Sequence, residues 1–253
     1  MKKATAIIPA RYGSTRFPGK PLALINGLPM IQHVCQRVAE AKMIDRVIVA
    51  TDDLRIVDVV KGFGGEVMLT KVDHPTGTDR LAEVAANIDS ELIVNVQGDE
   101  PLIDPRMVDQ AIAPLVENQH IQMGTLASVI NQVDDFHNPN VVKVVKDQSG
   151  LALYFSRAPI PWPRDLSPEQ LAETLSQLGL LRHIGLYVYR RELLLSYPSW
   201  PKTPLEKLEN LEQLRALERG VKLYVAETEF SCHGVDTLAD LARVSALMSM
   251  EKQ

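Results

Sequence analysis

Short apolar runs alternate with segments of helical periodicity through the first half of the chain. Five runs predict strands, at 4–9, 46–51, 66–70, 91–96 and 123–130. Apolar residues recur at helical spacing between them, over 29–42, 53–63, 78–88 and 105–118. Several of the strands are continuously apolar, as in a sheet that is covered on both faces. The order therefore predicts an α/β fold with a doubly wound, mostly parallel sheet.

The pattern changes after about residue 131. Two strands joined by a turn at 147–150 are expected within 140–157, and further strands at 182–190 and 221–228. The proline-rich stretch 157–168 predicts an ordered but irregular excursion. Leucines at helical spacing, a Thr start and a closing Gly predict one helix over 203–220, and 236–250 is expected to be an amphipathic helix capped by Asp236 or Thr237.

We see no repeat and no linker, so we expect one domain over 1–253, with a smaller β-rich elaboration around 131–200. The length of 253 residues and the hydrophobic content of 45% allow a full core. Lys and Arg total 27 against 32 Asp and Glu, a net charge of -5, which argues against a nucleic acid polymer as partner. A small anion held by a local cluster of cations stays open.

Two cysteines, Cys35 and Cys232, make a disulfide framework unexpected, and a reducing, cytoplasmic location fits. The basic N-terminal segment has only a short apolar stretch, broken by Pro9 and Arg11, and so lacks the core of a signal peptide. No apolar run approaches the roughly 18 residues that a membrane span requires.

A cationic, glycine-containing loop follows the first predicted strand. It carries Arg11, Arg16 and Lys20, and glycines at 13 and 19 allow tight turns that bring N–H groups toward an anion. The spacing is not that of a P-loop, because five residues separate the glycines and Lys20 is followed by Pro21. The glycines at 62–65 end a helix rather than bind a dinucleotide. The alternative for 11–20 is a solvated basic turn.

Two carboxylates are candidates for a metal site. Asp99 lies in VNVQGDEP, just past a buried strand and at the sheet edge of the basic loop, and magnesium prefers one or two carboxylates together with phosphate and water. Its alternative role, capping the next helix, is served better by Asp104 before Pro105. For Asp236, in GVDT, the residues alone favour a helix cap.

Eight blocks in order carry a resemblance that covers essentially the whole chain. They are IPARYGSTRFPGKPL, VDHPTGTDRLAEV, VNVQGDEP, NPNVVKVV, ALYFSRAPIPWPRD, LRHIGLYVYR, LEKLENLEQLRALERG and GVDTLADLARV. The chain resembles the CMP-KDO synthetases, the 3-deoxy-manno-octulosonate (KDO) cytidylyltransferases. The resemblance implies a nucleotide-diphospho-sugar transferase-like fold, CTP and KDO as substrates, CMP-KDO and pyrophosphate as products for lipopolysaccharide biosynthesis, Mg²⁺ as cofactor, and a homodimer.

The resemblance also implies roles for particular residues. Asp236 joins Asp99 in the magnesium site, and Arg80 reads cytosine, whose O2 and N3 both accept hydrogen bonds, whereas N3 of uracil donates. A helix-surface arginine is the alternative for Arg80. The complete sets are catalytic Arg11, Lys20, Asp99 and Asp236, nucleotide-binding Ala10, Arg11, Ser14, Lys20, Thr76, Gly77, Arg80 and Gln97, and sugar-binding Gln97, Arg157, His183, Tyr187, Glu212 and Gln213.

The chemistry of the expected substrates agrees with these residue types. An ulosonic acid carries a carboxylate and many hydroxyls, and His183 and Tyr187, four apart on a strand, share one face. Considered without the resemblance, His183 and Tyr187 are each equally consistent with a core residue whose polar atoms have hydrogen-bond partners within the protein. The anomeric hydroxyl attacks the α-phosphorus, the cations neutralise charge, and magnesium lowers the pKa of the hydroxyl, since no side chain stands out as a general base.

Three alternative functions stay open at the level of the sequence. An acylneuraminate cytidylyltransferase would run the same reaction on another acid. A nucleotide-sugar glycosyltransferase would share the sheet but use an Asp-x-Asp motif, which QGDE is not. A nucleotide sensor would bind CTP without turnover. No His or Cys pair has zinc spacing and no G-x-S-x-G motif occurs, so zinc and a serine hydrolase are not expected.

Overall fold

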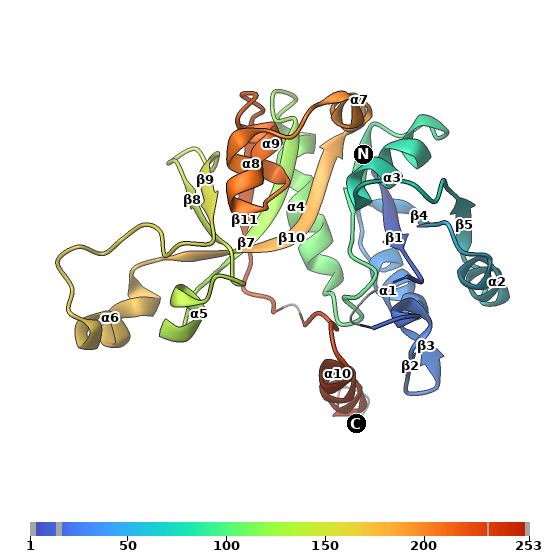
Figure 1. Ribbon diagram of the computed structural model, residues 1–253, viewed down its shortest axis with the longest axis horizontal. Coiled ribbons are helices and arrows are strands. Elements are labelled where there is room, and N and C mark those ends of the chain that lie inside the picture. Colours follow the sequence, from blue (N-terminus) through green and yellow to red (C-terminus); the bar gives the residue numbers. More distant parts are fainter. Residues whose placement is uncertain (1–3, 14–16, 232, 251–253) are drawn as a thin grey trace.

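The computed structural model describes residues 4–13, 17–231 and 233–250, and its centre is a nine-stranded sheet with helices on both faces (Figure 1). The strands of this sheet are β1 (Ala4–Ala10), β4 (Ile44–Thr51), β5 (Glu66–Leu69), β6 (Leu92–Asn95), β7 (Met123–Val129), β8 (Lys143–Lys146), β9 (Ala152–Ser156), β10 (Leu181–Arg190) and β11 (Leu223–Glu227). A separate small hairpin consists of β2 (Leu24–Ile25) and β3 (Leu28–Pro29). Each strand predicted from an apolar run is therefore present.

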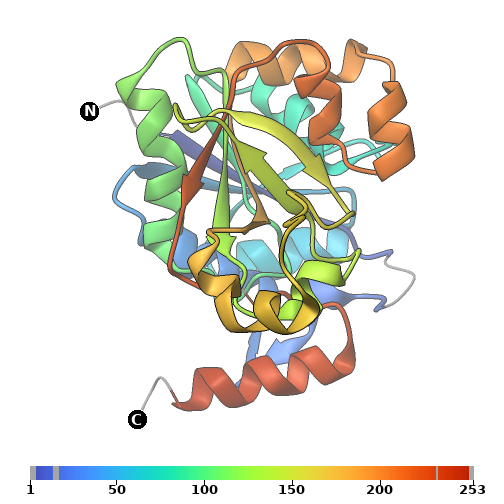
Figure 2. The ribbon, with the colours of Figure 1, turned by 90° about the vertical axis from the view of Figure 1, so that its left-hand side faces the viewer.

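The sheet is mixed but mostly parallel, as predicted. Its order is β11-β7-β10-β6-β1-β4-β5, and within this path β10 alone runs antiparallel to its neighbours among the described strands. The hairpin of β8 and β9 joins the sheet through β10 and projects away from it with α5 and α6 (Figures 1 and 2). The two strands predicted around the 147–150 turn are thus confirmed.

The four helices predicted in the first half are present. They are α1 (Met30–Ala39), α2 (Leu54–Gly62), α3 (Gly77–Ala86) and α4 (Pro105–Glu117). Asp104 caps α4 ahead of Pro105, as expected, and the Thr76 hydroxyl and the Asp79 carboxylate form a capping box at α3. The glycines after α2 end that helix, with Gly64 at φ 78. The remaining helices are α5 (Val133–His137), α6 (Pro168–Thr174), α7 (Arg191–Ser196), α8 (Pro204–Glu209), α9 (Gln213–Leu217) and α10 (Leu238–Met250), with short 3-10 turns η1 (Lys20–Leu22), η2 (Leu175–Gln177) and η3 (Tyr197–Ser199).

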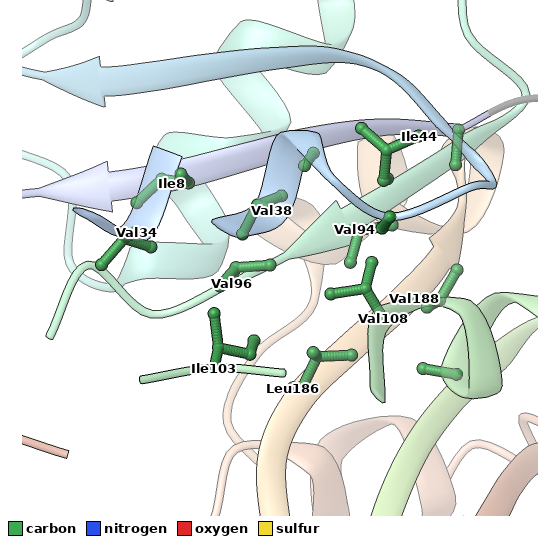
Figure 3. Close-up of a cluster of buried hydrophobic side chains, with 14 of the residues drawn as sticks. Ile8, Val34, Val38, Ile44, Val94, Val96, Ile103, Val108, Leu186 and Val188 are labelled. Carbon is green, nitrogen blue, oxygen red and sulfur yellow. The ribbon is translucent and has the colours of Figure 1, made fainter. Parts of the chain in front are cut away.

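Alternation along the strands divides the apolar side chains between two cores. On one face, Ile8 and Val94 pack with Val34 and Val38 of α1 and Val108 of α4 (Figure 3). On the other face, neighbouring residues such as Ile7 and Ile93 pack with α3, α7 and α9. Because side chains of a strand point alternately to its two faces, a continuously apolar strand serves both cores at once. The helices of the second face, α3 and α9, carry several of the candidate site residues.

The prediction of one helix over 203–220 is wrong, because the segment divides into α8 and α9 at Asn210, whose φ is 51. The side chain of Arg157, just past β9, donates from Nε to Glu209 O at 2.7 Å and from Nη2 to Asn210 O at 3.4 Å. The Glu209 carboxylate accepts from the Arg157 N–H and the Ser156 hydroxyl. These contacts occupy the end of α8, and Asn tolerates the left-handed conformation that redirects the chain. The helical periodicity of residues 203–220 contains no information about their contacts with the end of β9, so it does not predict this break.

The break at Asn210 predicts different effects for two substitutions. Asn210→Val should lower the free energy of unfolding by about 1–2 kcal/mol, because a β-branched residue is disfavoured at positive φ. Asn210→Gly should leave it nearly unchanged, since glycine adopts this conformation freely. Urea unfolding of both variants measures the difference. Equal loss in the two variants would show that the Asn210 side chain, not its backbone conformation, stabilises the break.

Candidate active site

The candidate site lies at a topological switch point of the sheet. From β1 the chain proceeds to β4 and β5 on one side, and then returns to place β6 on the other side of β1. The loops after β1 and β6 therefore flank a crevice at the carboxyl ends of the strands, the usual ligand position in such sheets. They also approach closely, since a Cβ on Gly98 would lie only 3.0 Å from Pro9 O. Glycine at 98 is required for that approach.

Lys20, Asp99 and Asp236 meet in this crevice. The Lys20 ammonium, on η1, lies 2.5 Å from Asp99 Oδ2 and 3.2 Å from Asp236 Oδ1. The Lys20 side chain is 15% exposed, against 31% for Asp99 and 54% for Asp236. Asp99 and Asp236 follow Lys20 by 79 and 216 positions in the sequence, and they share its ammonium. This pairing of Lys20 argues against the alternative in which residues 11–20 form a solvated basic turn.

The segment before α10 brings Asp236 to the crevice. The Val235 N–H donates to Asp99 O at 2.9 Å, and the Val235 side chain is fully buried in a small apolar cluster with Ile25 and Val244. The helix cap is Thr237: its hydroxyl accepts from the N–H of Asp240 at 3.2 Å, and the Asp240 carboxylate accepts from the N–H of Thr237 at 3.0 Å. Of the two capping residues considered from the sequence, Thr237 is correct, and the Asp236 carboxylate faces Lys20.

Gly19 and Tyr12 shape the basic loop that presents Lys20. Gly19 has φ 72, and its N–H donates to Tyr12 O at 2.8 Å. A Cβ on Gly19 would lie 3.2 Å from the Tyr12 ring, over which the Arg55 guanidinium of α2 stacks at 3.3 Å from the centroid. A side chain at position 19 would therefore be both strained and crowded. Ser14 and Arg16 of this loop lie outside the described residues.

The candidate nucleotide residues lie on both sides of the end of β1. Ala10 is the last residue of β1, and the exposed Arg11 donates from Nη2 to His74 O at 3.1 Å, just ahead of α3. Thr76 is the cap of α3 and Gly77 its first residue. Arg80, on the second turn of α3, is fully buried rather than on the helix surface. Its Nη1 lies 2.5 Å from Thr70 Oγ1 and 3.3 Å from Asp52 Oδ1.

His183 and Tyr187 lie side by side on β10, with ring centroids 5.3 Å apart, so the predicted common face is confirmed. Burial lowers the pKa of His183 to about 3, so the imidazole is neutral. Thr125 Oγ1 lies 2.8 Å from Leu186 O and 3.0 Å from His183 Nε2. The single hydroxyl proton goes to a carbonyl, which can only accept, so His183 donates from Nε2 and its Nδ1 is left as an acceptor.

Glu212 and Gln213 lie at the start of α9, beside α3. Thr76 Oγ1 is 2.7 Å from Asp79 Oδ2 and 3.1 Å from Glu212 Oε1, although one hydroxyl proton serves only one of them. Burial raises the pKa of Glu212, against the opposing charge of Arg215. Gln213 is 4% exposed, and its Nε2 has no partner among the described residues.

The remaining candidates differ in how free their side chains are. Gln97, two residues past β6, is half-buried at the crevice. The Arg157 guanidinium already donates to the carbonyls of Glu209, Asn210 and Pro139. Its main contacts therefore hold β9 against α8, and the N–H groups beyond these three remain for a ligand.

Asn95 is a site feature that was missed in the sequence. It ends β6, pairs in register with Tyr187, and is 4% exposed, while its Oδ1 has no partner in the part of the chain that the structure describes. The sequence did contain a signal for Asn95, because its amide interrupts the apolar run LIVNV and a buried amide requires hydrogen-bond partners. Among the described residues no group of three or more His, Cys, Asp and Glu side chains could hold a metal, and no helix is long and apolar enough to cross a membrane.

Comparisons with known proteins agree with this geometry. The family model described as cytidylyltransferase matches residues 5–223. The chain is 61% identical to the 3-deoxy-manno-octulosonate cytidylyltransferase of Syntrophotalea carbinolica, over 96% of this chain and 97% of that one. It is 57% identical to the enzyme of the same name from Geobacter sulfurreducens, with 95% and 97% covered. The solved structure of CMP:2-keto-3-deoxy-manno-octonic acid synthetase complexed with CTP matches with a TM-score of 0.91 and 42% identity, over 99% of this chain and 100% of that one.

The neutral state of His183 predicts a pH dependence of stability. Its folded pKa of about 3 lies below the ordinary 6.5, so the unfolded chain takes up the proton first as the pH falls. The contribution of neutral His183 is complete above pH 6.5 and is lost as the pH falls toward 3. Between pH 7 and pH 5 the wild type should lose about 2 kcal/mol more than His183→Gln in urea unfolding. His120→Gln, which removes an exposed histidine, should follow the wild type. Parallel curves for wild type and His183→Gln would contradict the neutral assignment.

Proposed function

The chain belongs to the family of 3-deoxy-manno-octulosonate cytidylyltransferases, and from this premise we propose that it transfers CMP from CTP to the anomeric hydroxyl of KDO, giving CMP-KDO and pyrophosphate. This is a step toward lipopolysaccharide. The observation that carries the proposal is the convergence of Lys20, Asp99 and Asp236 at the switch point of the sheet, in a chain that matches the relatives over nearly their whole length. This match favours KDO over an acylneuraminate, and a transferase over a sensor.

CTP lies with its phosphates at the basic loop and its base beside α3. Arg11 and Lys20 neutralise phosphoryl oxygens, and the N–H groups directly after Ala10 approach them. Ser14, the other residue expected to bind the nucleotide, lies outside the described residues. Thr76, Gly77 and Arg80 of α3 form the pocket for cytosine. The buried position of Arg80, close to Arg11, supports this arrangement, because two neighbouring cations favour an electron-rich ligand between them.

Asp99 and Asp236 are suited to hold Mg²⁺. Their oxygens face one shared ammonium, so two carboxylates are compensated by a single positive charge. This donor set fits magnesium, which takes one or two carboxylates and completes its shell with phosphate oxygens and water. When bound, the ion would neutralise charge on the phosphates and lower the pKa of the attacking hydroxyl.

KDO lies across β10 and α9, next to the nucleotide. His183 presents an acceptor Nδ1, Tyr187 a phenol, and Gln213 an unpartnered amide, all suited to hydroxyl groups. Glu212 touches Thr76, so the sugar and nucleotide sides share a contact. Gln97 lies between the two pockets. Arg157, with part of its guanidinium committed to carbonyls, meets the sugar carboxylate with its remaining N–H groups.

Catalysis then depends mainly on positioning. The chain holds the anomeric hydroxyl against the α-phosphorus, in line with the leaving pyrophosphate, and an attack so oriented gains much of its rate from the fixed geometry. Lys20 and Arg11 stabilise the charge that develops on the phosphoryl oxygens. His183 is neutral and bonded to Thr125, so it orients the sugar rather than neutralises it.

Pyrophosphate release from CTP tests this function. With KDO and Mg²⁺ the wild type should release pyrophosphate, with a clear preference for KDO over N-acetylneuraminate and no release when Mg²⁺ is removed. Asp99→Asn should lower kcat by roughly 100-fold or more, the usual loss when one preorganised charge is removed. Asp58→Asn, which removes an exposed carboxylate of α2, is the matched control and should retain full activity. Near-normal turnover of Asp99→Asn at saturating Mg²⁺ would refute the metal site.

We further propose one domain over residues 1–253, with the elaboration around 131–200 joining two copies of the chain in a cytoplasmic homodimer. Strands from both halves pair in the same sheet, which supports a single domain. Within the elaboration, Leu153 on β9 is 60% exposed and Trp162 is 64% exposed, and β9 pairs with β8 alone among the described strands. An apolar edge strand of this kind favours association. The buried thiol of Cys35, with its pKa raised to about 12 by burial, fits a reducing compartment.

Light scattering tests the dimer. The wild type should have twice the 28.1 kDa mass of one chain, and Leu153→Ser with Trp162→Ser should shift it toward one chain. Leu54→Ser, at an equally exposed position of α2, should leave the mass unchanged. A monomeric wild type would contradict the dimer, and a double variant that stays dimeric would contradict this surface.

A further inference from the structure

Arg80 is held by one nitrogen and leaves the other two without partners. Its side chain is 0% exposed. Nη1 lies 2.5 Å from Thr70 Oγ1 and 3.3 Å from Asp52 Oδ1. Nε and Nη2 have neither solvent contact nor a hydrogen-bond partner among the described residues. Burying N–H groups of a cation without acceptors is costly, so this arrangement is stable only if something offsets the cost.

The free nitrogens of Arg80 form the edge that other arginines of this chain use to bind carboxylates. Arg215 holds Glu206 through Nε at 2.8 Å and Nη2 at 2.6 Å. Arg46, Arg55 and Arg106 bind their carboxylates through the same two nitrogens. This edge presents two parallel N–H groups, which suit a ligand with two adjacent acceptors. In Arg80 the same edge is buried and has no hydrogen-bond partner among the described residues.

The surroundings of Arg80 point to the ligand rather than to a missing protein partner. Asp52 follows the carboxyl end of β4, and Thr70 follows that of β5, with its N–H donating to Thr51 O at 2.8 Å. Both anchors thus stand at the sheet edge of the switch point. Burial and the nearby charge of Arg11 lower the pKa of Arg80, while Asp52 raises it. Asp52 contacts only Nη1, at 3.3 Å, and neither Asp52 nor the nearby charge of Glu83 supplies an acceptor to Nε or Nη2.

We propose that Thr70 and Asp52 are positioning residues, which hold Nη1 of Arg80 so that its Nε–Nη2 edge meets O2 and N3 of cytosine and rejects uracil. The proposal rests on the proposed function and identifies what fixes its base specificity. With Nη1 anchored, the guanidinium cannot turn to use a single acceptor. Uracil presents an N–H at N3, so two donors would face each other and one charged hydrogen bond would be lost.

Thr70→Val tests the proposal, because valine keeps the shape of threonine and removes the acceptor. The ratio of kcat/KM for CTP to that for UTP should fall roughly tenfold, the scale of one hydrogen bond to a charged group. Most of the change should be in KM for CTP, while KM for KDO stays within a factor of two. Thr70→Ser should restore the ratio, since it returns the hydroxyl. Asp52→Asn, which keeps an acceptor oxygen but removes the charge, should lower the ratio less than Thr70→Val.

Thr228→Val is the matched control. Thr228 is as buried as Thr70, at 7% exposed, and lies past β11 at the opposite edge of the sheet. A ratio that is unchanged in Thr70→Val, or that falls equally in Thr228→Val, would overturn the proposal. If Thr70→Val does not fold, as circular dichroism would show, an unchanged ratio in folded Asp52→Asn overturns it instead.

These experiments distinguish a failure of the role proposed for Thr70 and Asp52 from a failure of the proposed function. A wild type that releases no pyrophosphate from CTP and KDO refutes the function. An active wild type whose CTP preference survives Thr70→Val refutes only the role of Thr70 and Asp52. Calorimetric binding of CTP and UTP to the same variants gives a readout that does not require turnover, and it should show the same loss of preference.

Discussion

The Lys20 ammonium between the carboxylates of Asp99 and Asp236 is the contact on which the site depends. Two carboxylates that approach one point repel each other, and a single ammonium compensates only part of their charge. The arrangement persists because three separate pieces of backbone hold it: η1 after the Gly19 turn, the loop that Gly98 allows to approach β1, and the Val235 N–H bonded to Asp99 O. The proposed magnesium site rests on this charge balance, next to the basic loop.

Three side chains with buried polar atoms that lack partners lie on elements that pack together. They are Arg80 of α3, Asn95 at the end of β6 and Gln213 of α9; in the part of the chain that the structure describes, Gln110 and Thr203 also carry such an atom. Most buried polar groups of a folded protein are hydrogen-bonded, so a concentration of exceptions on neighbouring elements indicates where a polar ligand completes the structure. α3 and α9 pack on the same face of the sheet, and the contact of Thr76 with Glu212 joins the candidate nucleotide-binding and sugar-binding residues there.

The elaboration of the second half shows how tertiary contacts overrule local pattern. The residues from 203 to 220 have helical periodicity throughout, yet Arg157 takes the carbonyls of Glu209 and Asn210 and the helix divides there. The division sets α9 as a separate helix, with Glu212 and Gln213 at its start. The break therefore decides where these two candidate sugar-binding side chains lie.

The sequence by itself determined where along the chain the strands of the sheet and the four helices of its first half lie, because apolar period and helix caps are local properties. Its resemblance to the CMP-KDO synthetases also indicated Lys20, Asp99 and Asp236 as a set, whereas the residues alone favoured a helix cap for Asp236. Only the tertiary structure decided that Thr237 rather than Asp236 caps α10, that Arg80 is buried with one edge free, that His183 is neutral against Thr125, and that Asn95 joins the site. These features depend on burial and on partners distant in the chain, and neither can be read from the residues nearby.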